Sequence, residues 1–270
     1  IKELYNLWKD EKNRNFAYQI AGIMNPDSSL NAREYKKKLS KNRNERIQFD
    51  TLMRFFEEKG HEKEFYIKWD MIASGRYMED SRITPQNNKI TRFLLSTAAT
   101  RTNIEFTKDE EGNVIVEPET MAMMKLSVAQ ALDYDLDKDL DTFVLAELEK
   151  DISIENDGSL EFKDTKKGIV IKEAIEVFKK SLVDTKYELT DEDKMKLSKI
   201  TSTNKDSFHA YQAVRELAKF DSEGESFISG SENKHNYDAH MVIEADGITS
   251  GMMIILSQMM TKDAQKLFEK

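Results

Sequence analysis

The sequence has 270 residues, of which 39% are hydrophobic and 34% are charged, and its formal net charge is -9. This length is enough for one large domain or two small ones, and the low numbers of proline and glycine favour a soluble, mostly helical chain over a β-sandwich or a barrel. The absence of cysteine excludes disulfides and thiolate zinc sites, no signal peptide is visible, and the most apolar stretch, Met252 to Met260, is shorter than the ~20 residues of a membrane-spanning helix.

The charges are unevenly distributed along the chain. Between Arg33 and Arg46 there are seven basic residues and two acidic ones, whereas between Asp133 and Glu161 there are eleven acidic residues and two basic ones. The basic residues of the first run are Arg33, Lys36, Lys37, Lys38, Lys41, Arg43 and Arg46. Such a run can follow the phosphates of a nucleic acid while an acidic lobe faces solvent or a partner. Two solvated helix faces would give the same pattern, so charge alone leaves the question open.

The first part of the chain is expected to be helical. In residues 1–64, apolar positions such as Ile47 and Phe55 recur at helical spacing between charges. The segment Asn25-Pro26-Asp27 predicts an early turn, and Gly60 is suited to end a helix.

The next part of the chain mixes strands and helices. Residues 65–72 are aromatic and β-branched, which predicts a strand. Pro85-Gln86-Asn87-Asn88 predicts a turn ahead of a helix from Ile90 to Ala99. Residues 104–117 suggest a hairpin whose loop is 109–113.

Helices dominate the predictions for the following hundred residues. Thr190, followed three residues later by Asp193, resembles a capping box. Residues 221–236 are rich in Ser, Gly, Asn and Glu, which predicts a polar connector. Helices are predicted for 119–150, 168–183 and 208–219, and a turn at Asn156-Asp157-Gly158.

Asp246 lies in a segment that suits a metal-binding carboxylate. His240 to Ala245 form a short strand candidate, and Asp246-Gly247 then predicts a turn into a strongly apolar helix. A carboxylate at the end of a strand projects from a rigid element, and magnesium binds such hard oxygen ligands. The same local pattern also fits an aspartate that forms an Asx-turn or caps the helix, which is the commoner role.

Three other features resemble binding sites in part. Gly75-Arg76 follows the first predicted strand, and an arginine there can bind phosphate in bidentate fashion or simply face solvent. The alternating aspartates from Asp133 to Asp141 lack the Gly and Glu positions of an EF-hand, so we expect a solvated helix start. The four histidines lack a metal-binding spacing, and His209 is expected to serve packing.

Taken in order, four segments resemble the single-subunit RNA polymerases of bacteriophages and mitochondria. Asn44 to Gly60 is similar to the helix that leaves the thumb for the palm, and Ser74-Gly75-Arg76-Tyr77 is similar to the Gly-Arg motif that holds the template and RNA hybrid. Pro85 to Leu95 is similar to the palm segment just downstream. Asp246-Gly247-Ile248-Thr249-Ser250-Gly251 looks like motif A, whose aspartate binds both catalytic magnesium ions.

The resemblance implies an α+β, mostly α fold that contains part of a right-hand polymerase palm and is completed by a second chain. The implied divisions are thumb helices in 1–64, a first palm part in 65–100, a mostly helical palm insertion in 101–236, the motif A strand-turn-helix in 237–260, and the start of the fingers or the chain end in 261–270.

The resemblance also implies template-directed transfer of nucleotides from NTPs to an RNA 3′ end with two Mg²⁺ ions. Asp246 would be the catalytic residue, and Asp246 with the Gly247 carbonyl would bind metal. The residues expected to bind nucleic acid are Gly75, Arg76, Lys89, Arg92, Arg46, Arg43 and Lys41.

The chain departs from the family pattern in ways that shape the prediction. Ile72 stands where the family usually has Asp or Thr, and Met252-Met253 replaces a common Gln-His pair. No fingers helix and no second catalytic aspartate is recognised, and two metal ions need a second carboxylate. We therefore expect the smaller subunit of a split, heterodimeric, podovirus-type RNA polymerase, active only with its partner subunit.

The expected partners are that second subunit, a DNA template, an RNA transcript, NTPs and an accessory factor for promoter opening, with no membrane. The expected location is the cytoplasm of the phage-infected bacterial host. Three alternatives stay open: a non-catalytic assembly or regulatory subunit with a relic palm, a fragment of a DNA polymerase, and a helical interaction protein. The Asp-Gly start of motif A favours RNA synthesis over DNA synthesis.

Overall fold

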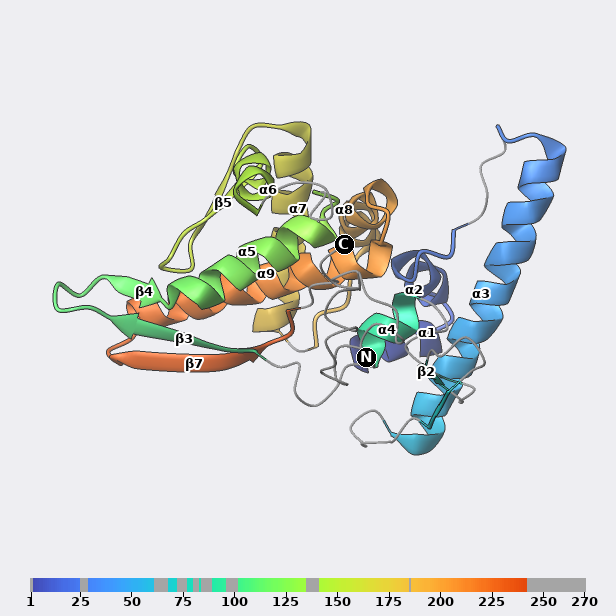
Figure 1. The fold of residues 1–270 in the computed structure, drawn as a ribbon, viewed down its shortest axis with the longest axis horizontal. Coiled ribbons are helices and arrows are strands. Elements are labelled where there is room, and N and C mark those ends of the chain that lie inside the picture. Colours follow the sequence, from blue (N-terminus) through green and yellow to red (C-terminus); the bar gives the residue numbers. More distant parts are fainter. Residues whose placement is uncertain are drawn as a thin grey trace, which may run out of the picture.

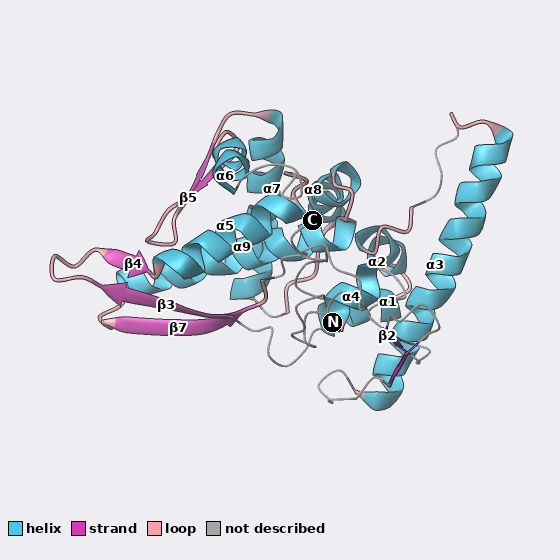
Figure 2. Cartoon of the chain, viewed as in Figure 1, coloured by secondary structure: helices cyan, strands magenta, loops and turns pink. Residues whose placement is uncertain are grey.

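The computed structural model describes residues 2–24, 29–60, 68–71, 77–79, 83, 89–95, 102–134, 141–184 and 186–241. Within these ranges the chain is mostly helical and has three small antiparallel sheets (Figure 2). This confirms the α+β, mostly α class. None of the described helices combines the length and the apolar character that crossing a bilayer requires.

Three helices form the N-terminal part, as predicted for 1–64. They are α1 (Lys2–Lys9), α2 (Arg14–Ile20) and α3 (Ala32–Lys59). The Asn31 side chain accepts a hydrogen bond from the Glu34 amide and so caps α3. Gly60 ends it with φ 84°, a conformation that favours glycine. The predicted turn at 25–27 lies outside the described residues.

The next elements are short. β1 (Trp69–Met71) pairs antiparallel with β2 (Tyr77–Glu79), and α4 (Lys89–Leu94) follows. β1 lies within the predicted strand 65–72, and α4 overlaps the predicted helix from Ile90 to Ala99. Residues 85–88, predicted as a turn, are outside the described residues.

A three-stranded sheet joins the two ends of the C-terminal part. β3 (Thr102–Lys108) and β4 (Val114–Val116) form the predicted hairpin, and β7 (Lys234–Ala239) pairs antiparallel with β3 from Thr102↔Ala239 to Thr107↔Lys234. Phe106 of β3 stacks on Phe220 of the long helix α9 (Ser207–Ser229), with ring centroids 5.3 Å apart. Because β3 and β7 are neighbours, residues 102 and 239 lie side by side (Figure 1).

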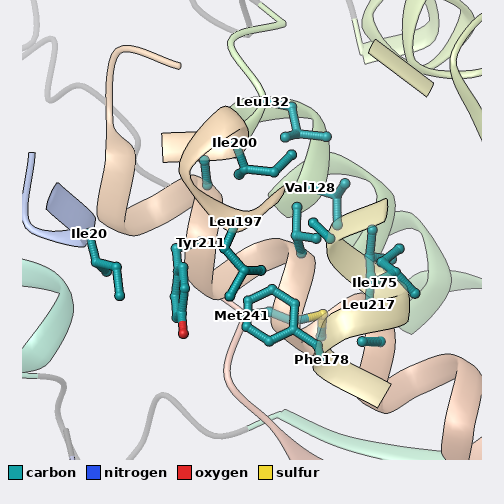
Figure 3. Close-up of a cluster of buried hydrophobic side chains, with 14 of the residues drawn as sticks. Ile20, Val128, Leu132, Ile175, Phe178, Leu197, Ile200, Tyr211, Leu217 and Met241 are labelled. Carbon is teal, nitrogen blue, oxygen red and sulfur yellow. The ribbon is translucent and has the colours of Figure 1, made fainter. Parts of the chain in front are cut away.

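Between β3 and β7 the chain builds a helical core. Val128 of α5 (Pro118–Ala131), Phe178 of α7 (Lys166–Val183), Ile200 of α8 (Asp191–Thr203) and Leu217 of α9 are among its buried side chains (Figure 3). The predicted helices and the turn at 156–158 are confirmed. The elements are α5 (Pro118–Ala131), α6 (Asp141–Leu148), β5 (Ile152–Ile154), β6 (Leu160–Phe162), α7 (Lys166–Val183), α8 (Asp191–Thr203) and α9.

One prediction near the end of the chain is wrong, and a second fails in the part that the structure describes. Residues 221–236 are not a connector, because α9 continues to Ser229 and β7 begins at Lys234. Several of the polar and small residues there have partners far away in sequence: Asp221 binds Lys179, and Gly224 packs against Gly158. The strand predicted at 240–245 is absent at its first two residues, because β7 ends at Ala239 and His240 and Met241 follow it; residues 242–245 lie outside the described residues.

Gly224 allows α9 to touch the turn between β5 and β6, which makes a first prediction. A Cβ at Gly224 would lie 2.8 Å from the Asp157 carbonyl oxygen and 3.0 Å from the Gly158 Cα. Replacing a helical glycine with alanine usually stabilises by about 1 kcal/mol, but overpacking costs about 1–3 kcal/mol. Gly224→Ala should therefore lower the free energy of unfolding in urea. Ser226→Ala, exposed on the same helix, is the control; a stabilised Gly224→Ala protein would contradict the contact.

The predicted capping box at Thr190 and Asp193 is confirmed and makes a second prediction. Asp193 is buried, and its carboxylate accepts hydrogen bonds from the hydroxyls of Thr190 and Tyr187, each at 2.6 Å. Burial raises the pKa of Asp193, but these hydrogen bonds and the nearby Lys180 outweigh it and lower the pKa to about 2.

Because the folded pKa lies below the usual value of 3.8, the ionised carboxylate stabilises the fold above pH 4. This stabilisation, roughly 2 kcal/mol, should be lost as the pH falls from about 4 to about 2. Asp193→Asn should therefore flatten the dependence of unfolding free energy on pH in this window. Asp191→Asn, fully exposed on the same helix, should leave the slope unchanged. Equal slopes for Asp193→Asn and the wild type would refute the shift.

Candidate nucleic-acid interface and metal site

Helix α3 carries the whole basic run from Arg33 to Arg46. Residues 31–41 are all exposed, and only the second half of the helix buries side chains against the protein. These buried residues are Phe49, Leu52, Met53 and Phe56. All seven basic residues of the run are exposed, and the N-terminal half of α3 projects away from the other helices at the right of Figure 1. The run is thus a solvated helix surface that phosphates can reach.

Four cations form one line along α3. Arg33, Lys36, Arg43 and Arg54 are separated by 3, 7 and 11 positions, which places them on one side of a helix. This side lies opposite the buried side chains, and we call the four residues the outer stripe. All four are exposed and form no salt bridge with another described residue. The stripe extends over about 32 Å at 1.5 Å per residue.

The predicted nucleic-acid-binding residues are not equivalent in the structure. Arg43 belongs to the outer stripe, whereas Lys41 is on another side of α3 and pairs with Glu45 at 3.5 Å. The Arg46 guanidinium lies 4.4 Å from the centre of the Tyr18 ring, so it packs on α2. Lys89 and Arg92 are on α4, but their side chains are outside the described residues, as are Gly75 and Arg76.

Asp50 fixes α3 on the two preceding helices. Its Oδ1 accepts hydrogen bonds from Trp8 Nε1 at 2.8 Å and from the Tyr18 hydroxyl at 2.7 Å. Burial and the hydrogen bond to Asp50 raise the pKa of Tyr18, so this hydroxyl keeps its proton as donor. Charge-assisted hydrogen bonds of this kind are stronger than neutral ones. The network therefore holds the outer stripe at a defined position relative to α1 and α2.

The predicted metal ligands Asp246 and Gly247 lie outside the described residues. The last described residue is Met241, which is 8% exposed and belongs to the core cluster that includes Phe178 (Figure 3). Met241 therefore anchors the chain five positions before Asp246.

The described residues contain no metal site of their own. No group of three or more His, Asp or Glu side chains within the described ranges is placed to hold an ion. Asp133 instead accepts a hydrogen bond from the Lys205 amide at 2.6 Å, and the aspartates at 135, 137 and 139 are outside the description. His209 is buried in α9, as expected for a packing residue. The magnesium prediction thus depends on residues beyond Met241.

Sequence reasoning missed one polar feature, which we call the α9 seam: Glu216, Lys219 and Glu223. Glu223 Oε2 lies 2.8 Å from His235 Nε2, and Lys219 Nζ donates to the Asp238 carbonyl at 2.9 Å. Glu216 Oε2 accepts from the His240 amide at 3.3 Å. These three charged residues are 3 and 4 positions apart in a largely buried helix, and this spacing in the sequence could have revealed the seam.

Comparison with known proteins bears on the N-terminal part. Residues 2–95 match the family model described as a virion DNA-directed RNA polymerase domain. No curated protein and no solved structure matches the chain. The family match covers α1 to α4, and so includes the outer stripe and the segments at 44–60, 74–77 and 85–95. It supports the expected kinship of this N-terminal part with a DNA-directed RNA polymerase.

The outer stripe makes a third prediction. The triple variant Arg33→Ala, Lys36→Ala, Arg43→Ala should weaken DNA binding and reduce the slope of log affinity against log salt by about 2–3, because each lost phosphate contact releases about one counterion fewer. Lys150→Ala, Lys163→Ala, Lys186→Ala removes the same charge from the other lobe and should keep the slope. Filter binding or fluorescence anisotropy measures both. An equal slope for the two variants would exclude the stripe as the binding surface.

Proposed function

We propose that the chain is a subunit of a DNA-directed RNA polymerase, that it holds nucleic acid on the outer stripe of α3, and that Asp246 is one of two catalytic aspartates. The family match over residues 2–95 carries this proposal, because three of the four polymerase-like segments lie wholly within it. The same part of the chain holds the outer stripe, so a polymerase-like sequence and a surface suited to phosphates coincide.

The charge distribution fits this role despite the negative total. With a net charge of -9, the chain as a whole repels polyanions, so binding requires a local positive surface. The outer stripe is such a surface, and it faces away from the rest of the protein. Contacts of this kind position a duplex or hybrid without reading its sequence. Recognition of a promoter would then fall to other surfaces or partners.

The proposed reaction is attack of an RNA 3′-hydroxyl on the α-phosphate of an NTP, with pyrophosphate as the leaving group. Catalysis of this reaction is mostly positioning and charge stabilisation. Two Mg²⁺ ions, when bound, would stabilise the attacking and leaving oxygens. By the resemblance, Asp246 and the Gly247 carbonyl would hold them from this chain. We assign the second aspartate and the fingers to a partner subunit.

The fold supports the division into a palm and an insertion. β3 and β7 are paired, so the segment between them starts and ends at neighbouring points. An inserted domain needs this geometry, because its two ends must rejoin the host domain. The proposed palm parts, 65–100 and 237–260, would then adjoin each other. The proposed boundary at 236 falls inside β7, which makes this strand the link between insertion and palm.

Substitution of Asp246 tests the catalytic assignment and is the fourth prediction. In the complex with the partner subunit, Asp246→Ala should reduce RNA synthesis more than about 100-fold, because one carboxylate of a two-metal site is lost. Assembly, followed by co-purification and gel filtration, should stay intact. Glu232→Ala removes an exposed carboxylate just before β7 and should keep activity within about twofold. Activity of Asp246→Ala within tenfold of the wild type would refute the assignment and favour a relic palm.

A further inference from the structure

The α9 seam follows β7 contact by contact. Glu223, Lys219 and Glu216 lie along one side of α9 and contact His235, Asp238 and His240, respectively. The helix and the strand therefore run antiparallel along this line of contacts. Two of the three contacts are to backbone groups. They therefore define where the strand lies along the helix, whatever side chains the strand carries.

β7 needs such a device because its own sequence specifies its position weakly. It reads Lys234-His235-Asn236-Tyr237-Asp238-Ala239, with one large apolar side chain on the face toward α9. Strands with few apolar residues are prone to slip in register. A slip by one residue would move everything that follows by about 3.3 Å. Displacements of about 1 Å can already cost an enzyme about 100-fold in rate.

Glu216 also links this strand to the N-terminal helices. Its side chain is 5% exposed, and its Oε1 lies 3.7 Å from Arg215 Nη1. Arg215 Nε in turn lies 2.9 Å from Glu3 Oε2, and the Tyr211 hydroxyl donates to Glu3 Oε1 at 2.7 Å. Glu3 is in α1, within the family match. The buried Glu216 carboxylate contacts both the His240 amide and Arg215, so it is suited to hold the end of β7 in place relative to α1.

We infer that the α9 seam sets the register of β7 and thereby fixes the point from which the chain continues toward Asp246, with Glu216 as the positioning residue whose contact, at His240, lies nearest to Asp246 in the chain. This inference rests on the proposed catalytic role of Asp246. Glu216 acts through the backbone at His240 and touches neither substrate nor metal. Its removal should therefore reduce the rate of the chemical step more than the binding of NTP.

Hydrogen exchange and kinetics together test the inference, as the fifth prediction. In the assembled polymerase, Glu216→Ala should speed amide exchange at 234–241 by about tenfold or more while exchange elsewhere stays unchanged. It should lower kcat by about tenfold or more and leave the KM for NTP within about threefold. Glu216→Gln keeps an acceptor for the His240 amide and should retain most of kcat.

Two further variants keep the test decisive. Lys219→Met removes the contact to the Asp238 carbonyl but fills the same space, so it replaces Glu216→Ala if that protein does not fold. Glu225→Ala removes a carboxylate of α9 that pairs with Lys179 and does not face β7, and it should change neither measurement. Unchanged exchange at 234–241, faster exchange over the whole chain, or an unchanged kcat would overturn the inference.

Asp246→Ala separates this inference from the proposed function. It should abolish synthesis and leave exchange at 234–241 as in the wild type. If Asp246→Ala stays active, the catalytic assignment fails, and the exchange data on Glu216→Ala still decide whether the seam holds the strand.

Discussion

The antiparallel pairing of β3 with β7 is the constraint on which the arrangement of the chain depends. It brings together two strands separated by more than a hundred residues and closes the helical core between them. Phe106 of β3 and Tyr237 of β7 face α9 from this sheet, and Met241 then enters the core. The segment that leads toward Asp246 therefore starts from a fixed point.

The N-terminal helices are tied to this framework by polar contacts as well as by packing. Glu3 of α1 meets Tyr211 and Arg215 of α9, and Asp50 joins α3 to Trp8 and Tyr18. The outer stripe of α3 and the end of β7, which precedes Asp246 in the chain, are thus linked through these contacts. Such a link suits the proposed role, in which nucleic acid and a reacting phosphate would be held in a fixed relation, since positioning is most of what catalysis of phosphoryl transfer requires.

Local signals predicted the elements whose formation is local. The hairpin loop at 109–113 and the capping box at Thr190 depend on neighbouring residues, and both are confirmed. The last turns of α9 contact Lys179 and Gly158, which lie far away in sequence. The polar connector predicted at 221–236 from composition was therefore wrong. Helical spacing could have separated Arg43 from Lys41, but only the fold shows that Arg46 packs on Tyr18. The predictions for Arg76 and Asp246 lie outside the described residues.

The central claim is that Asp246 binds catalytic metal in a site shared with a partner subunit. Iron-directed cleavage tests it directly: Fe²⁺ takes the place of Mg²⁺ at oxygen ligands, and added hydrogen peroxide is reduced there to hydroxyl radicals that cut the nearby backbone. In the assembled polymerase, cleavage of this chain should concentrate within a few residues of Asp246, disappear when Mg²⁺ competes, and be absent from the isolated chain. Cleavage that avoids the Asp246 segment, or that is equally strong without the partner, would contradict the shared site.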